Sequence, residues 1–263
     1  MDPKELRRLI DEALCSQDPG SALDTMLRQG DLALLPEIAE IVALGDANGL
    51  HKDVWSHTKA VVAGVPNLLE MRWSALLHDI GKAKTRRFIR GRVTFHNHDY
   101  VGAKMVDGIE RRLSLFSNDE TLLRTIRSLV LNHLRPASYN KNWSDSSIRR
   151  LLTEIGGPEE FKRLMCLSRA DLTTKIPARR ERAIARGNEL ERRINEIIAL
   201  DSRLRLPKLT MTVVIEKSGK APGPWVRKIQ LELERQLNEG SIKRDESAAY
   251  YADIGLTIME SEK

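Results

Sequence analysis

The stretch Trp73–Arg86, WSALLHDIGKAKTR, decides the fold of this chain and poses its functional question. Its first residues, through Leu77, are almost all apolar and are typical of a buried helix. An imidazole and a carboxylate, those of His78 and Asp79, follow side by side at the end of that run. Buried ionisable groups are costly unless they are paired or coordinated. The pair therefore needs partners from other parts of the chain.

Helical periodicity extends over almost the whole sequence. Apolar residues recur at three- and four-residue spacing, whereas strand-like alternation is rare, so we expect an all-α protein. Capping residues before amphipathic runs predict helix starts after Asp2, Asp18 and Ser144. The glycines expected to end helices are Gly30, Gly81 and Gly156.

Two stretches differ from this pattern. Residues 86–99, RRFIRGRVTFHNHD, predict either a short hairpin or an ordered loop. A long charged helix over about 178–200 is followed by a linker with proline and arginine, 201–209, and then by a tail. The segment 175–208 holds ten Lys or Arg against five Asp or Glu. It either guides RNA by its phosphates or is a solvated helix face.

The composition indicates a globular protein. With 263 residues, 41% hydrophobic and 30% charged, the chain can bury a substantial core. Two cysteines are too few for a disulfide framework, no apolar run is long enough to span a membrane, and the charged N-terminus does not resemble a secretory signal. We therefore expect a cytoplasmic protein with no membrane partner. Its net charge of +6 fits either a polyanionic partner or an ordinary basic surface.

Ionisable residues fall on the apolar stripes of several expected helices. His57 shares a stripe with Val54 and Val61, whereas His51 is about 120° around the same helix. The other residues on such stripes are His98, His133 and Asp171. No lysine or arginine is expected on the same stripes to neutralise the two aspartates.

A metal centre accounts for this burial. One histidine on an apolar stripe is usually a hydrogen-bonded core residue, but four histidines and two aspartates together are not. Divalent ions accept neutral imidazole and carboxylate ligands, and this ligand set fits Mn, Fe, Co, Ni, Zn or Mg. Six ligands exceed the needs of one tetrahedral ion and suit two ions that share a carboxylate.

The order of these residues carries a resemblance to a known family. His57, His78-Asp79, His98, His133 and Asp171 resemble the metal-ligand pattern of the HD superfamily of phosphohydrolases in its two-metal form. The stretches HKDVWSHT, MRWSALLHDIGKAKTR, GRVTFHNHDYVGAKM and LVLNHLRP are similar to the HD half of bacterial CCA-adding tRNA nucleotidyltransferases and related poly(A) polymerases. The stretches 22–41 and 215–248 resemble the helical neck and the C-terminal tail of that family.

The resemblance implies three regions and two departures. The regions are a helical neck over 1–46, an HD metal-dependent phosphohydrolase domain over 47–200 and a small helical tail over 201–263. The polymerase half of the family has no counterpart, since GDANG at 45–49 is expected to be a loop. The second departure is Asn97, which stands where relatives often carry glycine.

The resemblance also implies ligand roles. Asp79 would bridge two ions, with His57, His78 and Asp171 completing one site and His98 and His133 the other. The alternative is one ion, with His98 and His133 binding substrate. Gly81 would end the helix so that both His78 and Asp79 can serve the centre.

Hydrolysis at phosphorus is the chemistry that two such ions favour. Lys82 and Arg135 would act as phosphate clamps, or as solvated charges at helix ends. His51 and His96 would approach the substrate, or lie at the surface.

Three functions follow from this interpretation. The first is a phosphodiesterase or phosphatase acting on nucleotides or RNA ends, including 2′,3′-cyclic phosphates, a class that the resemblance implies. The second is a tRNA-binding or assembly module that partners a separate nucleotidyltransferase chain. The third is a di-iron oxygenase with the same ligand set. Oligomeric state is not specified by the sequence.

Overall fold

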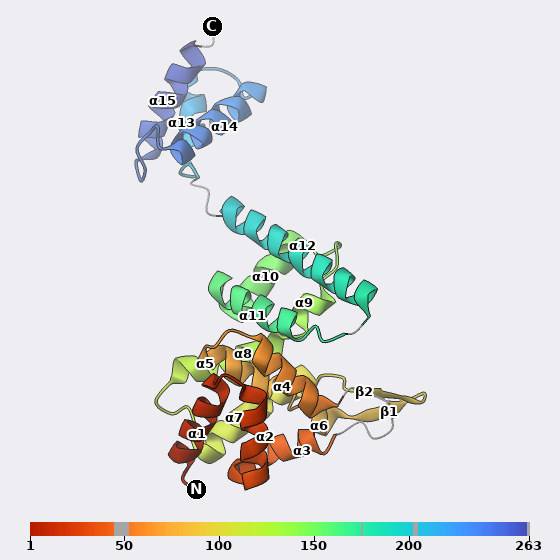
Figure 1. Ribbon diagram of the computed structural model, residues 1–263. Helices are drawn as coiled ribbons and strands as arrows, with labels where there is room; N and C mark the ends of the chain where they lie inside the picture. Colours follow the sequence, from red (N-terminus) through yellow and green to blue (C-terminus); the bar gives the residue numbers. More distant parts are fainter. Residues whose placement is uncertain (45–52, 175, 202–204, 262–263) are drawn as a thin grey trace. The chain divides into compact units, whose positions relative to one another are not determined.

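A computed structural model describes residues 1–44, 53–174, 176–201 and 205–261. The chain forms two compact units, Met1–Ile194 and Asn195–Lys263, and the long helix α12 (Pro177–Asp201) runs through the division. Helices dominate both units, and in the described residues the strands are those of one hairpin (Figure 1). The all-α prediction is therefore confirmed.

The N-terminal helices of the first unit begin at the predicted caps. Asp2 and Asp18 accept hydrogen bonds from the backbone amides of Lys4 and Ser21. Gly30 ends the second helix in the left-handed conformation, at φ 80°. The elements are α1 (Pro3–Cys15), α2 (Pro19–Gln29), the 3-10 helix η1 (Asp31–Leu34), α3 (Pro36–Val42) and α4 (Val54–Gly64).

The middle of the first unit contains the hairpin. The elements are α5 (Leu69–Leu77), α6 (Lys82–Thr85), β1 (Arg87–Ile89), β2 (Arg92–Thr94), α7 (His98–Leu113) and α8 (Glu120–Asn132). The strands are antiparallel, with Phe88 opposite Val93. The two turn residues have positive φ, 47° at Arg90 and 72° at Gly91, as a tight hairpin turn of matching twist requires.

The first unit closes with four helices, α9 (Arg135–Ser138), α10 (Asp145–Ile155), α11 (Pro158–Ala170) and most of α12. Ser144 caps α10 by accepting from the Ser147 amide, and Gly156 ends it at φ 101°. The charged helix predicted over about 178–200 corresponds to α12.

The second unit is a small helical group of α13 (Thr210–Ser218), α14 (Pro224–Glu239) and α15 (Ala248–Ser261). Its core includes Val214, Leu233 and Tyr251, all buried. A Cβ at Gly255 would lie 3.1 Å from a methyl of Leu233, so the small residue lets α15 pack closely against α14.

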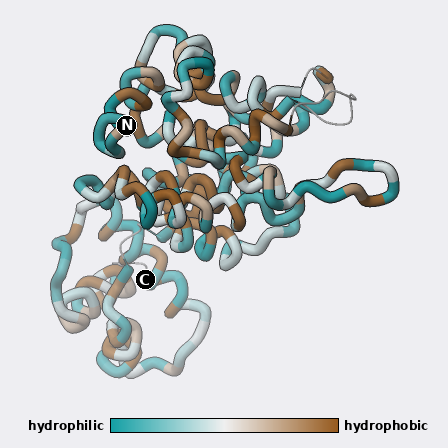
Figure 2. Tube along the Cα trace, turned by 90° about the horizontal axis from the view of Figure 1, so that it is seen from below, coloured by the Kyte–Doolittle hydropathy of each residue, from teal (hydrophilic) through white to brown (hydrophobic). Residues whose placement is uncertain are grey.

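Helix α5 is the centre of the first unit. It packs against α1, α4, α8 and α11, and all residues from Met71 to Leu77 are buried. The indole of Trp73 stacks edge-on to Phe116 and donates its N–H to Asp11 at 2.6 Å. In Figure 2 hydrophobic residues gather in the interior of this unit, while the hairpin projects from it. The predicted buried helix is confirmed, and it positions the pair that follows it.

The expectation that Gly81 ends the helix is wrong, because glycine is needed there for a different reason. Helix α5 already ends at Leu77, and Gly81 has right-handed dihedrals, φ −64° and ψ −16°. A Cβ at Gly81 would lie 2.0 Å from the His98 carbonyl oxygen and 2.6 Å from the Gly102 nitrogen. Glycine is needed here because the turn after Asp79 presses against the backbone of α7. This contact joins distant parts of the chain.

Gly81→Ala should destabilise the protein by at least about 2 kcal/mol, since the methyl group collides with backbone that cannot rotate away. For a domain of this size that corresponds to a fall of about 4–8 °C in the thermal midpoint. The matched control is Gly108→Ala on α7, where the nearest atom to an added Cβ is 3.9 Å away. It should be neutral or stabilising by up to about 1 kcal/mol. Equal midpoints for Gly81→Ala and wild type would contradict this packing argument.

Candidate metal centre

Five helices bring the predicted ligand residues together, mostly at their ends. His57 lies in the first turns of α4, and His98 is the first residue of α7. The others directly follow helices: His78 and Asp79 come after α5, His133 after α8 and Asp171 after α11. Convergence of helix ends places several side chains at one point without interrupting a helix.

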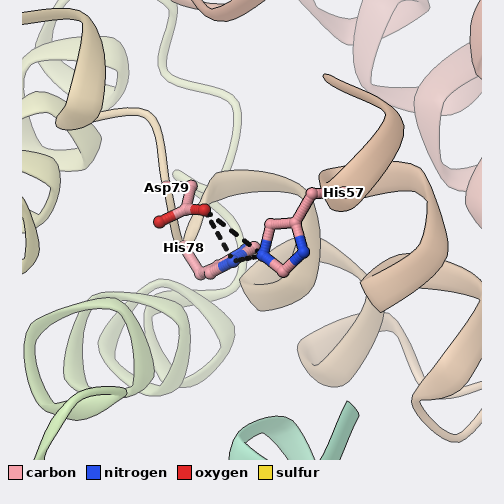
Figure 3. Close-up of side chains that lie close together, drawn as sticks. All are labelled: His57, His78 and Asp79. Carbon is pink, nitrogen blue, oxygen red and sulfur yellow. Dashed lines mark hydrogen bonds and ion pairs between the residues drawn. The ribbon is translucent and has the colours of Figure 1, made fainter. Parts of the chain in front are cut away.

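Asp79 is the centre of this cluster and is almost fully buried. Its Oδ2 lies 3.4 Å from Nε2 of His57 and 3.2 Å from Nε2 of His78 (Figure 3). Its other oxygen, Oδ1, lies 3.2 Å from Nε2 of His98 and 4.0 Å from Nε2 of His133. The carboxylate thus faces one pair of histidines with each oxygen. Two groups of potential ligands, His57-His78-Asp79 and Asp79-His98-His133, share it.

The ring orientations have a common cause. Nδ1 of His78, His98 and His133 each lies 2.7–2.8 Å from the carbonyl oxygen three residues earlier in the chain. A carbonyl only accepts, so Nδ1 must carry the proton and Nε2 of the neutral ring presents a lone pair. Nδ1 of His57 lies 3.0 Å from the Thr173 hydroxyl instead. Such outer hydrogen bonds are the usual way in which proteins orient metal-binding imidazoles.

Neighbouring imidazoles face one another through Nε2. The Nε2 atoms of His57 and His78 are 3.3 Å apart, and those of His98 and His133 are 3.1 Å apart. Two lone pairs at this separation repel unless a proton or a cation lies between them. Neutral imidazoles and carboxylates are the ligands that divalent transition ions prefer. The donor set therefore fits two cations on either side of Asp79.

Asp171 closes the cluster on its more accessible side. Its Oδ1 lies 2.9 Å from Nε2 of His57 and 3.8 Å from Nε2 of His78. Its side chain is 28% exposed, against 2% for Asp79. Burial raises the pKa of Asp171, but the hydrogen bond with His57 and the nearby imidazoles outweigh it and lower that pKa to about 2. Asp171 is thus a carboxylate at neutral pH, and its exposed edge meets solvent on this side of the cluster.

Burial and charge act in opposite directions on the most enclosed groups. Burial raises the pKa of Asp79, but the charge of the neighbouring His78, hydrogen bonds from the protonated rings of His78 and His98, and the Lys82 charge hold it well below its usual value. Burial lowers the pKa of His78, and the adjacent carboxylates more than offset it, so the result is a raised pKa. For His133, burial and the nearby His78 lower the pKa to about 4.

Lys82 supplies a cation to Asp79 from outside the apolar stripes, on which no lysine or arginine was expected. Its Nζ donates to Asp79 Oδ2 at 2.6 Å, and it lies 5.6 Å from the centre of the Phe95 ring. Lys82 belongs to the separate short helix α6, which begins three residues after Asp79. A cationic group therefore lies at the edge of the cluster.

The remaining candidates lie elsewhere. Arg135, expected as a second clamp, pairs with Glu154 at 2.5 Å, and its Nε is buried without a hydrogen-bond partner. His96 is exposed in the loop between β2 and α7. His51 lies outside the described residues, as does the GDANG stretch. Thr173, which contacts His57, was missed, and its only sequence signal is its position two residues after Asp171.

Asn97 has a structural explanation. It precedes α7 with φ 59° and ψ 24°, the left-handed conformation. Glycine adopts this conformation freely, and asparagine is among the few other residues that tolerate it. The difference from relatives therefore leaves the start of α7, and with it His98, in place.

A comparison with protein families decides the membership. The model of the HD domain matches residues 38–175, about half of the chain, and the match includes all six clustered residues. The chain belongs to the HD domain family. HD domains form a superfamily of metal-dependent phosphohydrolases, and their fold is an all-α bundle, as observed here.

Two of the similar curated proteins are named as tRNA nucleotidyltransferases. The HD protein is 33% identical over 141 residues to the A-adding tRNA nucleotidyltransferase of Deinococcus radiodurans, and 35% identical over 141 residues to the CC-adding tRNA nucleotidyltransferase of Thermus thermophilus. Each match covers 50% of this chain but only 31% and 30% of the relative. The Multifunctional CCA protein of Neisseria meningitidis is 31% identical over 108 residues, 39% of this chain and 25% of the relative. The HD protein thus shares about a third or less of each relative's length.

No helix in the described part of the HD protein combines the length and apolarity needed to cross a membrane.

The two most enclosed histidines should titrate far apart in the metal-free HD protein. The ring of His133 should stay neutral down to about pH 4, whereas that of His78 should take its proton above the ordinary value of 6.5. Because the unfolded chain protonates His133 near 6.5, the stabilising contribution of its neutral ring is lost as the pH falls from 6.5 toward 4. NMR titration of the ring carbons measures both values. A His133 that titrates above His78 would contradict the described environment.

Proposed function

We propose that this HD protein is a two-metal phosphohydrolase, a phosphodiesterase or phosphatase acting on nucleotides or RNA ends, with 2′,3′-cyclic phosphates as the first substrates to test. The observation that carries the proposal is the position of Asp79, whose two oxygens face two separate histidine pairs. One carboxylate with a pair of Nε2 donors on each side is the arrangement that suits a bridged pair of ions.

In this proposal His57, His78 and Asp171 hold one ion, His98 and His133 hold the other, and Asp79 bridges them. Two divalent ions, drawn from Mn, Fe, Co, Ni, Zn or Mg, would activate a water as the nucleophile and stabilise charge on the phosphoryl oxygens. The protein contributes the orientation. Backbone carbonyls fix the rings of three histidines, and the Thr173 hydroxyl fixes the fourth.

Lys82 and Asp171 are proposed to act on the substrate side of the centre. Lys82 balances the charge of Asp79 through its 2.6 Å hydrogen bond and can transfer that contact to a phosphate oxygen when one is present. Asp171 is the more exposed of the two carboxylates, which supports an approach of substrate from its side. Arg135 is less suited to the role expected for it, because Glu154 already holds its guanidinium.

RNA is the favoured source of the phosphate ester. The net charge of +6 suits a polyanion, and the relatives named above are enzymes named for tRNA. The basic segment 175–208 is a weaker argument, because Arg192 and Arg193 in it pair with Glu189 and Asp145. In this proposal residues 47–200 form the catalytic domain, and the protein acts in the cytoplasm.

One alternative has an observation in its favour. The match covers less than a third of each of the two relatives named as tRNA nucleotidyltransferases. In the alternative, this HD protein binds tRNA as a module beside a separate nucleotidyltransferase chain. Hydrolysis and tRNA binding after metal removal distinguish the two functions. The oxygenase hypothesis rests only on the shared ligand set.

Asp79→Asn should remove at least one metal ion and lower the rate of phosphate-ester hydrolysis at least about a hundredfold, because the substitution keeps the volume but removes a charge that both ions need. Metal content by mass spectrometry and turnover of a cyclic nucleotide measure the two effects. The matched control is Asp107→Asn, which loses a surface ion pair with Arg127 and should change neither value by more than about twofold. A folded Asp79→Asn protein with full metal content and full rate would refute the two-metal function.

Removal of metal with a chelator should abolish hydrolysis and lower the thermal midpoint, since ions that bind only the folded chain stabilise it by about 2.7 kcal/mol at a concentration of 100 times Kd. Adding back Mn, Co, Ni, Mg or Zn one at a time should restore both for at least one metal. If no metal supports hydrolysis while the chelated protein still binds tRNA, the module function replaces the proposed one.

A further inference from the structure

The hairpin β1–β2 lies in the sequence between two residues of the candidate metal centre. Asp79 precedes it and His98 follows it; along the chain, α6 leads into the hairpin and residues 95–97 lead out of it. Figures 1 and 2 show it projecting from the helices of the first unit. It therefore starts and ends beside the candidate centre and extends away from it into solvent.

The charged side chains of the segment that contains the hairpin are all basic. Residues 80–97 contain six lysines or arginines and no aspartate or glutamate. Lys82 and Lys84 pair with Asp79 and Glu40. No carboxylate among the described residues pairs with the four hairpin arginines, which are Arg86, Arg87, Arg90 and Arg92. Arg87, Arg90 and Arg92 are exposed, so their charges can meet an external anion.

The two faces of the hairpin differ. Residues opposite each other in an antiparallel pair share a face, so Phe88 and Val93 lie on one face, and Arg87 and Arg92 lie on the other. Phe88 is 65% exposed, and its ring has the guanidinium of Arg86 at 5.1 Å from its centre. An exposed aromatic ring with neighbouring arginines is the combination that holds a nucleobase and its phosphates in sequence-tolerant binding of single strands.

We propose that the hairpin binds a single-stranded segment of RNA whose scissile phosphate lies at the metal centre. The RNA passes over an edge of the two-stranded hairpin, so that Phe88 stacks on a base from one face and Arg87 and Arg92 contact backbone phosphates from the other. The inference rests on the proposed function and names the substrate class more narrowly. An acidic peptide would match the arginines, but it would leave the exposed ring of Phe88 unused.

The dimensions agree with a short segment of strand. Arg92 lies six positions before His98, which is at most about 20 Å of extended chain at roughly 3.3 Å per residue. Stacked nucleotides advance by roughly 3.4 Å each along a strand. The hairpin thus reaches the nucleotides within a few positions of the proposed scissile phosphate.

The test measures binding of a fluorescein-labelled single-stranded RNA octanucleotide by anisotropy, over a range of salt concentrations. Arg87→Ala/Arg92→Ala should weaken binding and lower the slope of log affinity against log salt by about 1.4, since each lost phosphate contact lowers it by about 0.7. Arg87→Lys/Arg92→Lys should largely restore the slope. Phe88→Ala should weaken binding about five- to 150-fold, and Phe88→Trp should not.

The matched control removes two exposed arginines elsewhere in the first unit, as Arg8→Ala/Arg127→Ala, with the same change in net charge. Both have carboxylate partners on their own surface, so RNA affinity and slope should stay near wild type. Metal content and thermal midpoint of every variant show whether the fold is retained.

Three results would overturn the inference: an unchanged slope for Arg87→Ala/Arg92→Ala, equal effects of Phe88→Ala and Phe88→Trp, or displacement of RNA by polyglutamate as readily as by unlabelled RNA. If these occur while the wild type hydrolyses phosphate esters, the proposed function stands and the hairpin inference falls. If the hairpin variants lose RNA as expected but the wild type hydrolyses nothing, the binding surface stands and the proposed function falls.

Discussion

The carboxylate of Asp79 is the group on which the rest of the structure depends. It is almost fully buried, and four imidazoles and an ammonium group surround it within 4.0 Å. A carboxylate at this depth is tolerated only with such partners, because its desolvation would otherwise exceed any packing gain. The helices that supply the partners must therefore end at one place, and α5 lies between them with all residues from Met71 to Leu77 buried.

Short-range contacts fix the orientation of the side chains that converge on Asp79. Three of the four rings are held by a carbonyl only three residues earlier, so their direction follows from the helix end itself. Gly81 then allows the turn after Asp79 to touch the backbone at the start of α7, which brings His98 beside the Asp79 carboxylate. Catalytic metal sites need such positioning before the ion arrives, since mobile ligands would lose entropy on binding. The fold and the candidate chemistry thus have the same geometric requirement.

Much of the fold could be predicted from the sequence because the relevant signals are local. The caps at Asp2, Asp18 and Ser144 and the apolar run before His78 depend on neighbours within a few residues, and all have the predicted structure. Apolar stripes likewise indicated which histidines lie inside.

Contacts between distant segments could not be predicted in this way. The close approach of Gly81 to His98 and the hydrogen bond of Thr173 with His57 exist only after the helices pack. Periodicity on one helix also gave no indication that Lys82, on a separate short helix, would reach Asp79, or that Glu154 would hold Arg135. Side-chain partners at the edge of the site are thus determined by tertiary structure.

The central claim is that Asp79 is shared by two ions, and anomalous diffraction from crystals grown with Mn²⁺ tests it most directly. The account predicts two anomalous peaks about 3.5–4 Å apart. One should be bound by His57, His78 and Asp171, the other by His98 and His133, with one Asp79 oxygen on each. A single peak, or a pair of peaks that Asp79 does not join, would contradict it.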